Sequence, residues 1–147
     1  MTAAPHLLLV EARFYTHISD LLRQGAEKAL AEAGATFEAV EVPGSFEIPG
    51  AIKFASASGQ FDGYVALGCV IRGETSHYDY VCNESTRGLQ DLAVRDGLPV
   101  GFGIATCENE AQALARASVE GRDMGGKAAK ACLTMVGLKR RFSGGTR

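Results

Sequence analysis

Short apolar segments and longer amphipathic segments alternate along the chain. Four short segments are rich in apolar residues, and the first and third are almost continuously apolar, as expected of strands covered on both faces. Between and after them, apolar residues recur three and four positions apart, which predicts helices. The predicted strands are Leu7–Ala12, Phe37–Val42, Tyr64–Ile71 and Val100–Thr106. The predicted helices cover residues 18–33, Phe46–Ser56, Tyr78–Val94, Glu108–Ala117 and Gly125–Leu138.

This alternation predicts an α/β fold. Strands separated by helices favour right-handed crossovers, and so a three-layer α/β/α sandwich with a four-stranded parallel sheet flanked by helices on both faces. Gly34 should end the first helix, and Pro49 is compatible with the second helix only in its first turn. We expect one domain over residues 1–147, with a frayed basic tail at Lys139–Arg147.

Charge and composition exclude several classes of protein. The net charge is -2 and the isoelectric point is about 5.9, which argues against a nucleic-acid-binding protein. No apolar run approaches the ~20 residues of a membrane span, and Met1–His6 lacks the features of a signal peptide. We therefore expect a cytoplasmic location. The four cysteines form no CxxC metal or redox pattern, and we expect them to be small buried residues that stay reduced, with no metal site.

The chemistry of a parallel sheet lies beyond the carboxyl ends of its strands. In this sequence, aromatic, acidic and histidine side chains recur in the turns that follow the four predicted strands. These turns are residues 11–15, 42–47, 71–78 and 106–109. Their convergence on one edge of the sheet predicts a binding site there.

The third turn is the richest in candidate groups. Gly73 allows close approach of a ligand, and Glu74, Thr75 and Ser76 lead into a helix whose free N–H groups favour an anion. Helix capping is the commoner role for such Ser and Thr residues. His77 follows, and its imidazole can transfer protons near neutral pH, although a lone histidine is more often a surface hydrogen-bonding group.

Other candidates are aromatic or basic. Phe14 and Phe46 can each stack on a planar heterocycle or simply plug an apolar gap, and Glu47 can accept ligand hydrogen bonds or favour a helix start. Arg116 and Arg122 can bind phosphate, but most such arginines are only solvated. The sequence contains neither a GxxxxGK[ST] nor a GxGxxG motif.

Several segments together resemble the lumazine synthase family. The two most specific are VPGSFEIP at Val42–Pro49 and ALGCVIRGETSHYDYV at Ala66–Val81. Ala12–Phe14, Pro99–Thr106 and Ala113–Ala117 complete the set, in the order that the family has them. The resemblance spans nearly the whole chain and implies a flavodoxin-like version of the predicted sandwich.

The resemblance also implies an activity. The family condenses 5-amino-6-ribitylaminouracil with 3,4-dihydroxy-2-butanone 4-phosphate, releases phosphate and water, and forms 6,7-dimethyl-8-ribityllumazine, without a metal or organic cofactor. This is the penultimate step of riboflavin biosynthesis. The family builds each site between neighbouring subunits of a homopentamer, and some members form larger assemblies.

Site roles follow from the resemblance by position. Phe14 would stack on the pyrimidine, and His77 would be the catalytic proton shuttle. Phe102 would cover the pyrimidine of the adjacent subunit's site, and Arg116 would neutralise the phosphate. The remaining substrate contacts would be Ser45, Phe46 and Glu47 to the ribityl chain, backbone groups of Cys69, Val70 and Ile71 to the uracil edge, and N–H groups of Glu74 and Thr75 to the phosphate.

Three departures from the family pattern keep alternatives open. Tyr15 replaces a common asparagine, Met124 replaces a lysine, and Lys127 stands where an acid is common. Met124 leaves open a lumazine- or riboflavin-binding protein with little activity, and a shell or scaffold protein is a third possibility. The start and end of the chain resemble the smaller-assembly branch of the family, which favours a free pentamer.

Overall fold

A single parallel sheet forms the middle layer of the computed structural model, which describes residues 3–144. Its strands are β1 (His6–Ala12), β2 (Thr36–Val42), β3 (Gly63–Ile71) and β4 (Val100–Cys107). They lie in the order β2-β1-β3-β4, and each neighbouring pair is parallel. The predicted parallel sheet is therefore confirmed, with strand ends within one residue of the predicted positions.

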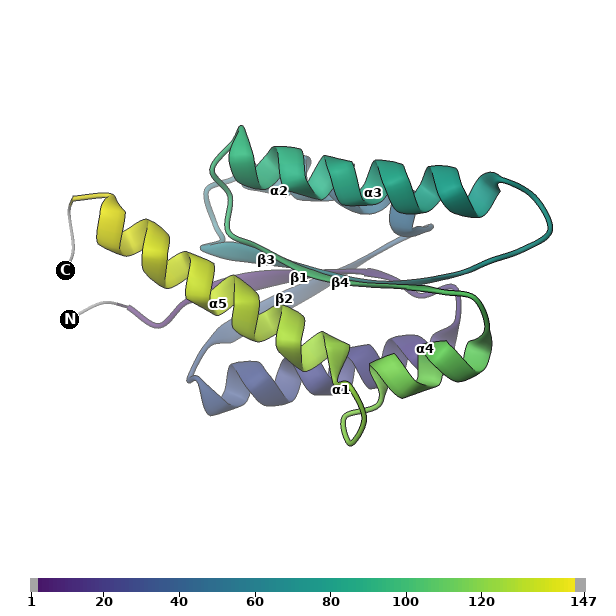
Figure 1. Cartoon of the computed structure of the whole chain (residues 1–147). Helices are drawn as coiled ribbons and strands as arrows, with labels where there is room; N and C mark the ends of the chain where they lie inside the picture. The colour runs from purple at the N-terminus through teal and green to yellow at the C-terminus, as the bar shows by residue number, and fades with distance from the viewer. Residues whose placement is uncertain (1–2, 145–147) are drawn as a thin grey trace.

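Helices cover both faces of the sheet and complete the three predicted layers (Figure 1). The helices are α1 (Thr16–Glu32), α2 (Ile48–Ser56), α3 (His77–Val94), α4 (Glu110–Ala117) and α5 (Met124–Phe142). Figure 1 shows α2 and α3 on one face and α1, α4 and α5 on the other. None of the helices within residues 3–144 is long and apolar enough to cross a membrane.

Alternating side chains along the strands build two separate cores. In β1, Leu7 and Leu9 are fully buried in the cluster that includes α1 and α5 residues. Leu8 and Val10 face the opposite way, into the cluster that includes α2 and α3 residues. Burial of each such side chain stabilises the fold by roughly 1.5–3 kcal/mol, so both faces of the sheet contribute to stability.

Two local signals in the sequence place helix ends correctly. Gly34 has φ 71°, a left-handed conformation that suits glycine, and it lies just beyond the end of α1. Pro49 lies in the first turn of α2, where its missing N–H has no helical partner. The predicted helix from Phe46 is only partly right, because Ser45–Glu47 forms a short 3-10 turn before α2 begins at Ile48.

The predicted frayed tail begins too early. Instead of ending at Leu138, α5 continues to Phe142. The Lys139 Nζ donates to the Gly97 carbonyl at 2.8 Å, and Arg140 donates to the Ala3 carbonyl at 2.9 Å. These contacts hold the basic segment against the molecule, while residues 145–147 of the predicted tail lie outside the described part of the chain.

Candidate active site

A cavity of about 580 Å³ lies at the carboxyl ends of β1 and β3. It is bounded by the turn after β1, the 3-10 turn before α2, and the first turns of α3. Most of the predicted site residues line it: Phe14, Ser45, Phe46, Glu47, Cys69, Val70, Ile71 and His77. The fold therefore brings together residues as far apart in the sequence as Phe14 and His77, as the sheet-edge rule predicts.

The 3-10 turn places a buried hydroxyl group at the cavity. Ser45 is 5% exposed, and its Oγ has no hydrogen-bond partner among the described residues. Across from it, β3 has Gly68, where an added Cβ would lie 2.6 Å from that Oγ. Buried hydroxyl groups are normally hydrogen-bonded, so this Oγ has an unused hydrogen-bonding capacity, although neighbouring atoms cover it almost completely.

Two aromatic rings stand at the mouth of the cavity with large exposed surfaces. Phe14 is 77% exposed and Phe46 is 54% exposed, whereas large apolar side chains are usually buried. The ring of Tyr15 meets that of Phe14 edge-on, with centroids 4.9 Å apart and an interplanar angle of 81°. The high exposure of Phe14 leaves ring surface accessible to a planar group, which argues against the role of a simple hydrophobic plug.

The loop after β3 is held from outside the cavity. Arg72 Nε donates to Glu108 at 2.8 Å, and its guanidinium carbon lies 4.4 Å from the centroid of the Tyr78 ring. The hydrogen bond to Glu108 raises the pKa of Arg72, so this guanidinium stays charged. We did not predict this ion pair from the sequence, because its partners lie 36 positions apart.

His77 is the first residue of α3 and is one of the residues that line the cavity. The backbone N–H of His77 donates to the Thr75 Oγ1 at 3.3 Å. Ser76 is the N-cap residue, but its side chain makes no capping hydrogen bond. His17 is different, because its Nε2 lies 2.6 Å from Glu110 in an exposed pair outside the cavity lining.

The cysteine at the end of β3 is suited to backbone contacts only. Burial raises the pKa of the Cys69 thiol to about 12, and the neighbouring Cys107 adds to this effect. Its thiolate is therefore scarce at neutral pH, which argues against nucleophilic chemistry. In the described part of the chain, no group of three or more His, Cys, Asp and Glu side chains is placed to hold a metal ion.

Comparison with known proteins agrees with this geometry. Residues 4–140 match the sequence pattern of the 6,7-dimethyl-8-ribityllumazine synthase family. The chain belongs to this family. The lumazine synthase of Agrobacterium fabrum is 54% identical over 145 residues, covering 95% of this chain and 98% of that protein. The synthase of Sphingopyxis alaskensis is 56% identical, covering 93% and 96%. That of Rhizobium meliloti, named synthase 1, is 53% identical and covers 93% of each chain.

Four residues expected from the family pattern do not line the cavity: Glu74, Thr75, Phe102 and Arg116. Glu74 and Thr75 lie in the loop just before α3. Arg116 is in the last turn of α4 and donates to the Thr106 carbonyl at 3.1 Å and the Cys107 Sγ at 3.2 Å. Its guanidinium is thus fixed at the carboxyl end of β4, whereas the side chain of Arg122 is exposed.

Phe102 projects from the edge strand β4 and is 42% exposed. It lies on the same face of the sheet as Ile104, towards α2 and α3. The cavity also includes Tyr80 and Val81, which are not among the predicted site residues. A signal for them was present, since they follow His77 by three and four positions and so share its face of α3.

Proposed function

We propose that this chain condenses 5-amino-6-ribitylaminouracil with 3,4-dihydroxy-2-butanone 4-phosphate to give 6,7-dimethyl-8-ribityllumazine, phosphate and water. The observation that carries the proposal is the cavity at the sheet edge. In a chain of this family, it gathers aromatic, carboxylate, hydroxyl and imidazole groups from separate turns. Such groups match a flat heterocycle with a polyhydroxy chain.

The pyrimidine substrate occupies the cavity. Phe14 stacks on its ring, since an exposed ring face gains most by covering another planar group. The unpartnered hydroxyl of Ser45 and the carboxylate of Glu47 bind hydroxyl groups of the ribityl chain, and Phe46 packs against its carbons. The polar edge of the uracil bonds to backbone groups of residues 69–71 at the end of β3.

The phosphate of the second substrate lies at the start of α3. Backbone N–H groups of Glu74 and Thr75 donate to it, because the free N–H groups of a helix start favour an anion. Arg116 supplies the compensating charge from the neighbouring end of β4. Its hydrogen bond to the Thr106 carbonyl fixes the guanidinium before the ligand binds, which lowers the entropic cost of binding.

His77 moves protons between the two substrates. The amine of the pyrimidine attacks the ketone, water leaves as the imine forms, phosphate is then eliminated, and ring closure releases the second water. Each step needs a proton added or removed near the reacting atoms, and His77 is the imidazole that lines the cavity. Holding both substrates in one site contributes further, since orientation alone supplies up to ~7–11 kcal/mol.

The protein functions as a homopentamer with sites between subunits. Phe102 supports this assembly, because an aromatic ring on an edge strand is half-exposed and free to cover a neighbour's site. Sedimentation analysis and electron microscopy distinguish a pentamer from a larger shell. The four described cysteines are free thiols, which supports a reducing location such as the cytoplasm.

A spectroscopic assay of lumazine formation with both substrates tests the activity. His77→Ala and Arg116→Ala should lower the rate by roughly 10²-fold or more, the typical loss for a proton-transfer group or a charged ligand contact. His17→Ala and Arg122→Ala are the matched controls and should retain parental rates. If the parent protein formed lumazine only at the uncatalysed rate, the proposed activity would be refuted.

A binding protein with little activity is the second candidate. The observation that favours it is Met124, an apolar residue at the start of α5 that packs partly buried against the core. The family pattern has a lysine at this position, so Met124 removes a positive charge that a lysine would supply. Riboflavin titration beside the same assay decides between the two, because a binding protein holds the flavin but forms no lumazine.

A further inference from the structure

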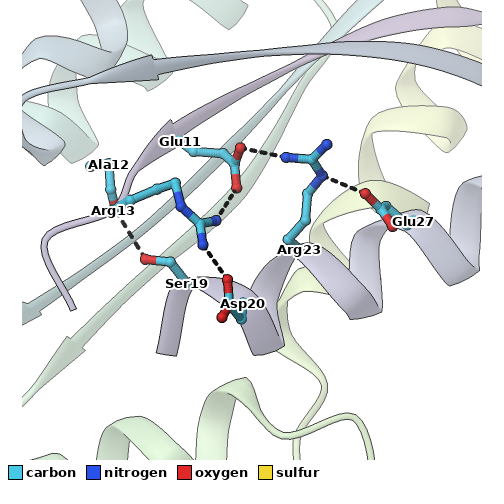
Figure 2. A network of polar contacts seen from close by, with 7 residues as sticks. All are labelled: Glu11, Ala12, Arg13, Ser19, Asp20, Arg23 and Glu27. Atoms are coloured by element: carbon cyan, nitrogen blue, oxygen red, sulfur yellow. Dashed lines mark hydrogen bonds and ion pairs between the residues drawn. The ribbon is translucent and has the colours of Figure 1, made fainter. Parts of the chain in front are cut away.

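A buried carboxylate lies next to the turn that carries Phe14. Glu11 is the last residue but one of β1 and is 4% exposed. Each of its oxygens accepts a hydrogen bond from a different arginine: Oε1 from Arg13 at 2.8 Å and Oε2 from Arg23 at 2.6 Å (Figure 2). A buried charge requires such partners, so this carboxylate holds both guanidinium groups in place.

The two arginines extend the network to helix α1. Arg13 also donates to Asp20, and Arg23 donates through Nε to Glu27 at 2.6 Å. Partial burial lowers the pKa of Arg13, but hydrogen bonds to Asp20 and Glu11 outweigh this effect and raise it. The end of β1 and residues 20–27 of α1 are therefore joined by one chain of alternating charges (Figure 2).

The backbone on either side of Phe14 is bonded to the same helix. The Ser19 Oγ donates to the Ala12 carbonyl at 3.4 Å, and the Ser19 N–H donates to the Tyr15 carbonyl at 2.9 Å. The start of α1 has no side-chain cap and no acidic residue in its first turn. The Arg13–Asp20 pair is a further link between the turn and the helix.

The position of the Phe14 ring depends on this backbone more than on its own packing. The ring is 77% exposed, so little surrounding structure restrains it, and its described aromatic contact is with the adjacent Tyr15. An exposed side chain can present one face to a ligand only if the Cα–Cβ direction is fixed. Residues 12–15 fix that direction through their bonds to α1.

We propose that Glu11 is a positioning residue for substrate stacking: by holding Arg13 and Arg23, it fixes the turn at residues 12–15 so that Phe14 faces the planar ring of the pyrimidine. The inference rests on the proposed function, because it needs a flat ligand in the cavity. A purely structural link between β1 and α1 would affect folding but would not act through Phe14.

The first test measures binding of the reaction product, 6,7-dimethyl-8-ribityllumazine, to the full chain. Glu11→Gln keeps the side-chain volume but replaces one acceptor oxygen with an amide NH₂, which repels an arginine. We expect product affinity to fall roughly two- to tenfold, the range that corresponds to losing an aromatic stack. Glu27→Gln is the matched control, because it removes an outer partner of Arg23 and should leave affinity unchanged.

A double-mutant cycle shows whether Glu11 acts through Phe14. In a Phe14→Ala background, Glu11→Gln should change product affinity by less than about twofold, since the stack is already absent. The KM for the pyrimidine should rise with the product Kd, while the KM for the phosphate substrate stays at the parental value. If Glu11→Gln fails to fold, Asp20→Asn replaces it, with a smaller loss in the same direction and the same dependence on Phe14.

Three outcomes overturn the inference. One is an equal loss of affinity with and without Phe14. Another is a lower midpoint of unfolding with unchanged product affinity. The third is a parent that neither binds the product nor forms it, which refutes the proposed function as well, whereas the first two leave that function standing.

Discussion

Two glycine-to-alanine changes in the same helix should alter stability in opposite directions. At Gly125, where α5 crosses α1, an added Cβ would lie 2.0 Å from the Leu22 carbonyl oxygen. At Gly137, near the other end of α5, nothing lies within 4 Å of the added atom. Neither glycine has a left-handed φ, so the substitutions differ mainly in the space available.

The expected magnitudes follow from that space. The contact at Gly125 is with backbone, which cannot rotate away, so the two helices must separate by more than an ångström. Overpacking of this kind typically costs about 1–3 kcal/mol. Gly137→Ala avoids the entropic cost of a glycine in a helix and should stabilise the fold by about 0.5–1 kcal/mol. The two variants should therefore differ by roughly 1.5–4 kcal/mol.

Urea unfolding followed by far-ultraviolet circular dichroism measures this difference. All samples need the same protomer concentration, because assembly would stabilise the folded state by mass action. We expect the midpoint to fall for Gly125→Ala and to rise for Gly137→Ala, with an unchanged dependence on urea. Midpoints that move in the same direction would refute the argument that backbone contact between α1 and α5 decides the sign.

Two further predictions concern the cavity and the buried thiols. Ser45→Ala should leave the free energy of unfolding unchanged or slightly higher, because the hydroxyl has no described partner. The KM for the ribityl substrate should rise roughly two- to tenfold. A large loss of stability with an unchanged KM would contradict this prediction. Burial raises the pKa of Cys132 to about 12, against ~8.5 in an unfolded chain. Above the lower value the unfolded state loses protons first, so stability should decline as pH rises from about 8.5 towards 12, and Cys132→Ala should flatten that decline. An equally steep decline in the variant would show that other groups cause it.

Much of the architecture could be predicted from the chain itself. Strands buried on both faces need apolar side chains on both, so β1 and β3 stand out as nearly continuous apolar runs. Gly34 and Pro49 mark helix ends through backbone rules that need no tertiary partner. The 3-10 turn at Ser45–Glu47 and the extension of α5 to Phe142 were missed, because both depend on contacts with distant segments.

Some residues of the candidate site could likewise be predicted from the sequence, and others were missed. The sheet-edge rule and the family resemblance together place Phe14, Ser45 and His77 in one region from the sequence alone. Tyr80 and Val81 were overlooked, although helical spacing from His77 pointed to them. The roles of the site residues and the domain limits of 1–147 remain predictions for the experiments above.

By itself, the sequence determined which strands and helices follow one another along the chain, and which edge of the sheet carries the candidate site. Both follow from local periodicity and from the geometry of parallel strands. Only the tertiary structure decided that Glu11, in an otherwise apolar strand, is a buried charge that bonds to Arg13 and Arg23. The physical reason is that a buried carboxylate is stable only with its partners in place, and one of these comes from a helix that has first to fold back onto the sheet.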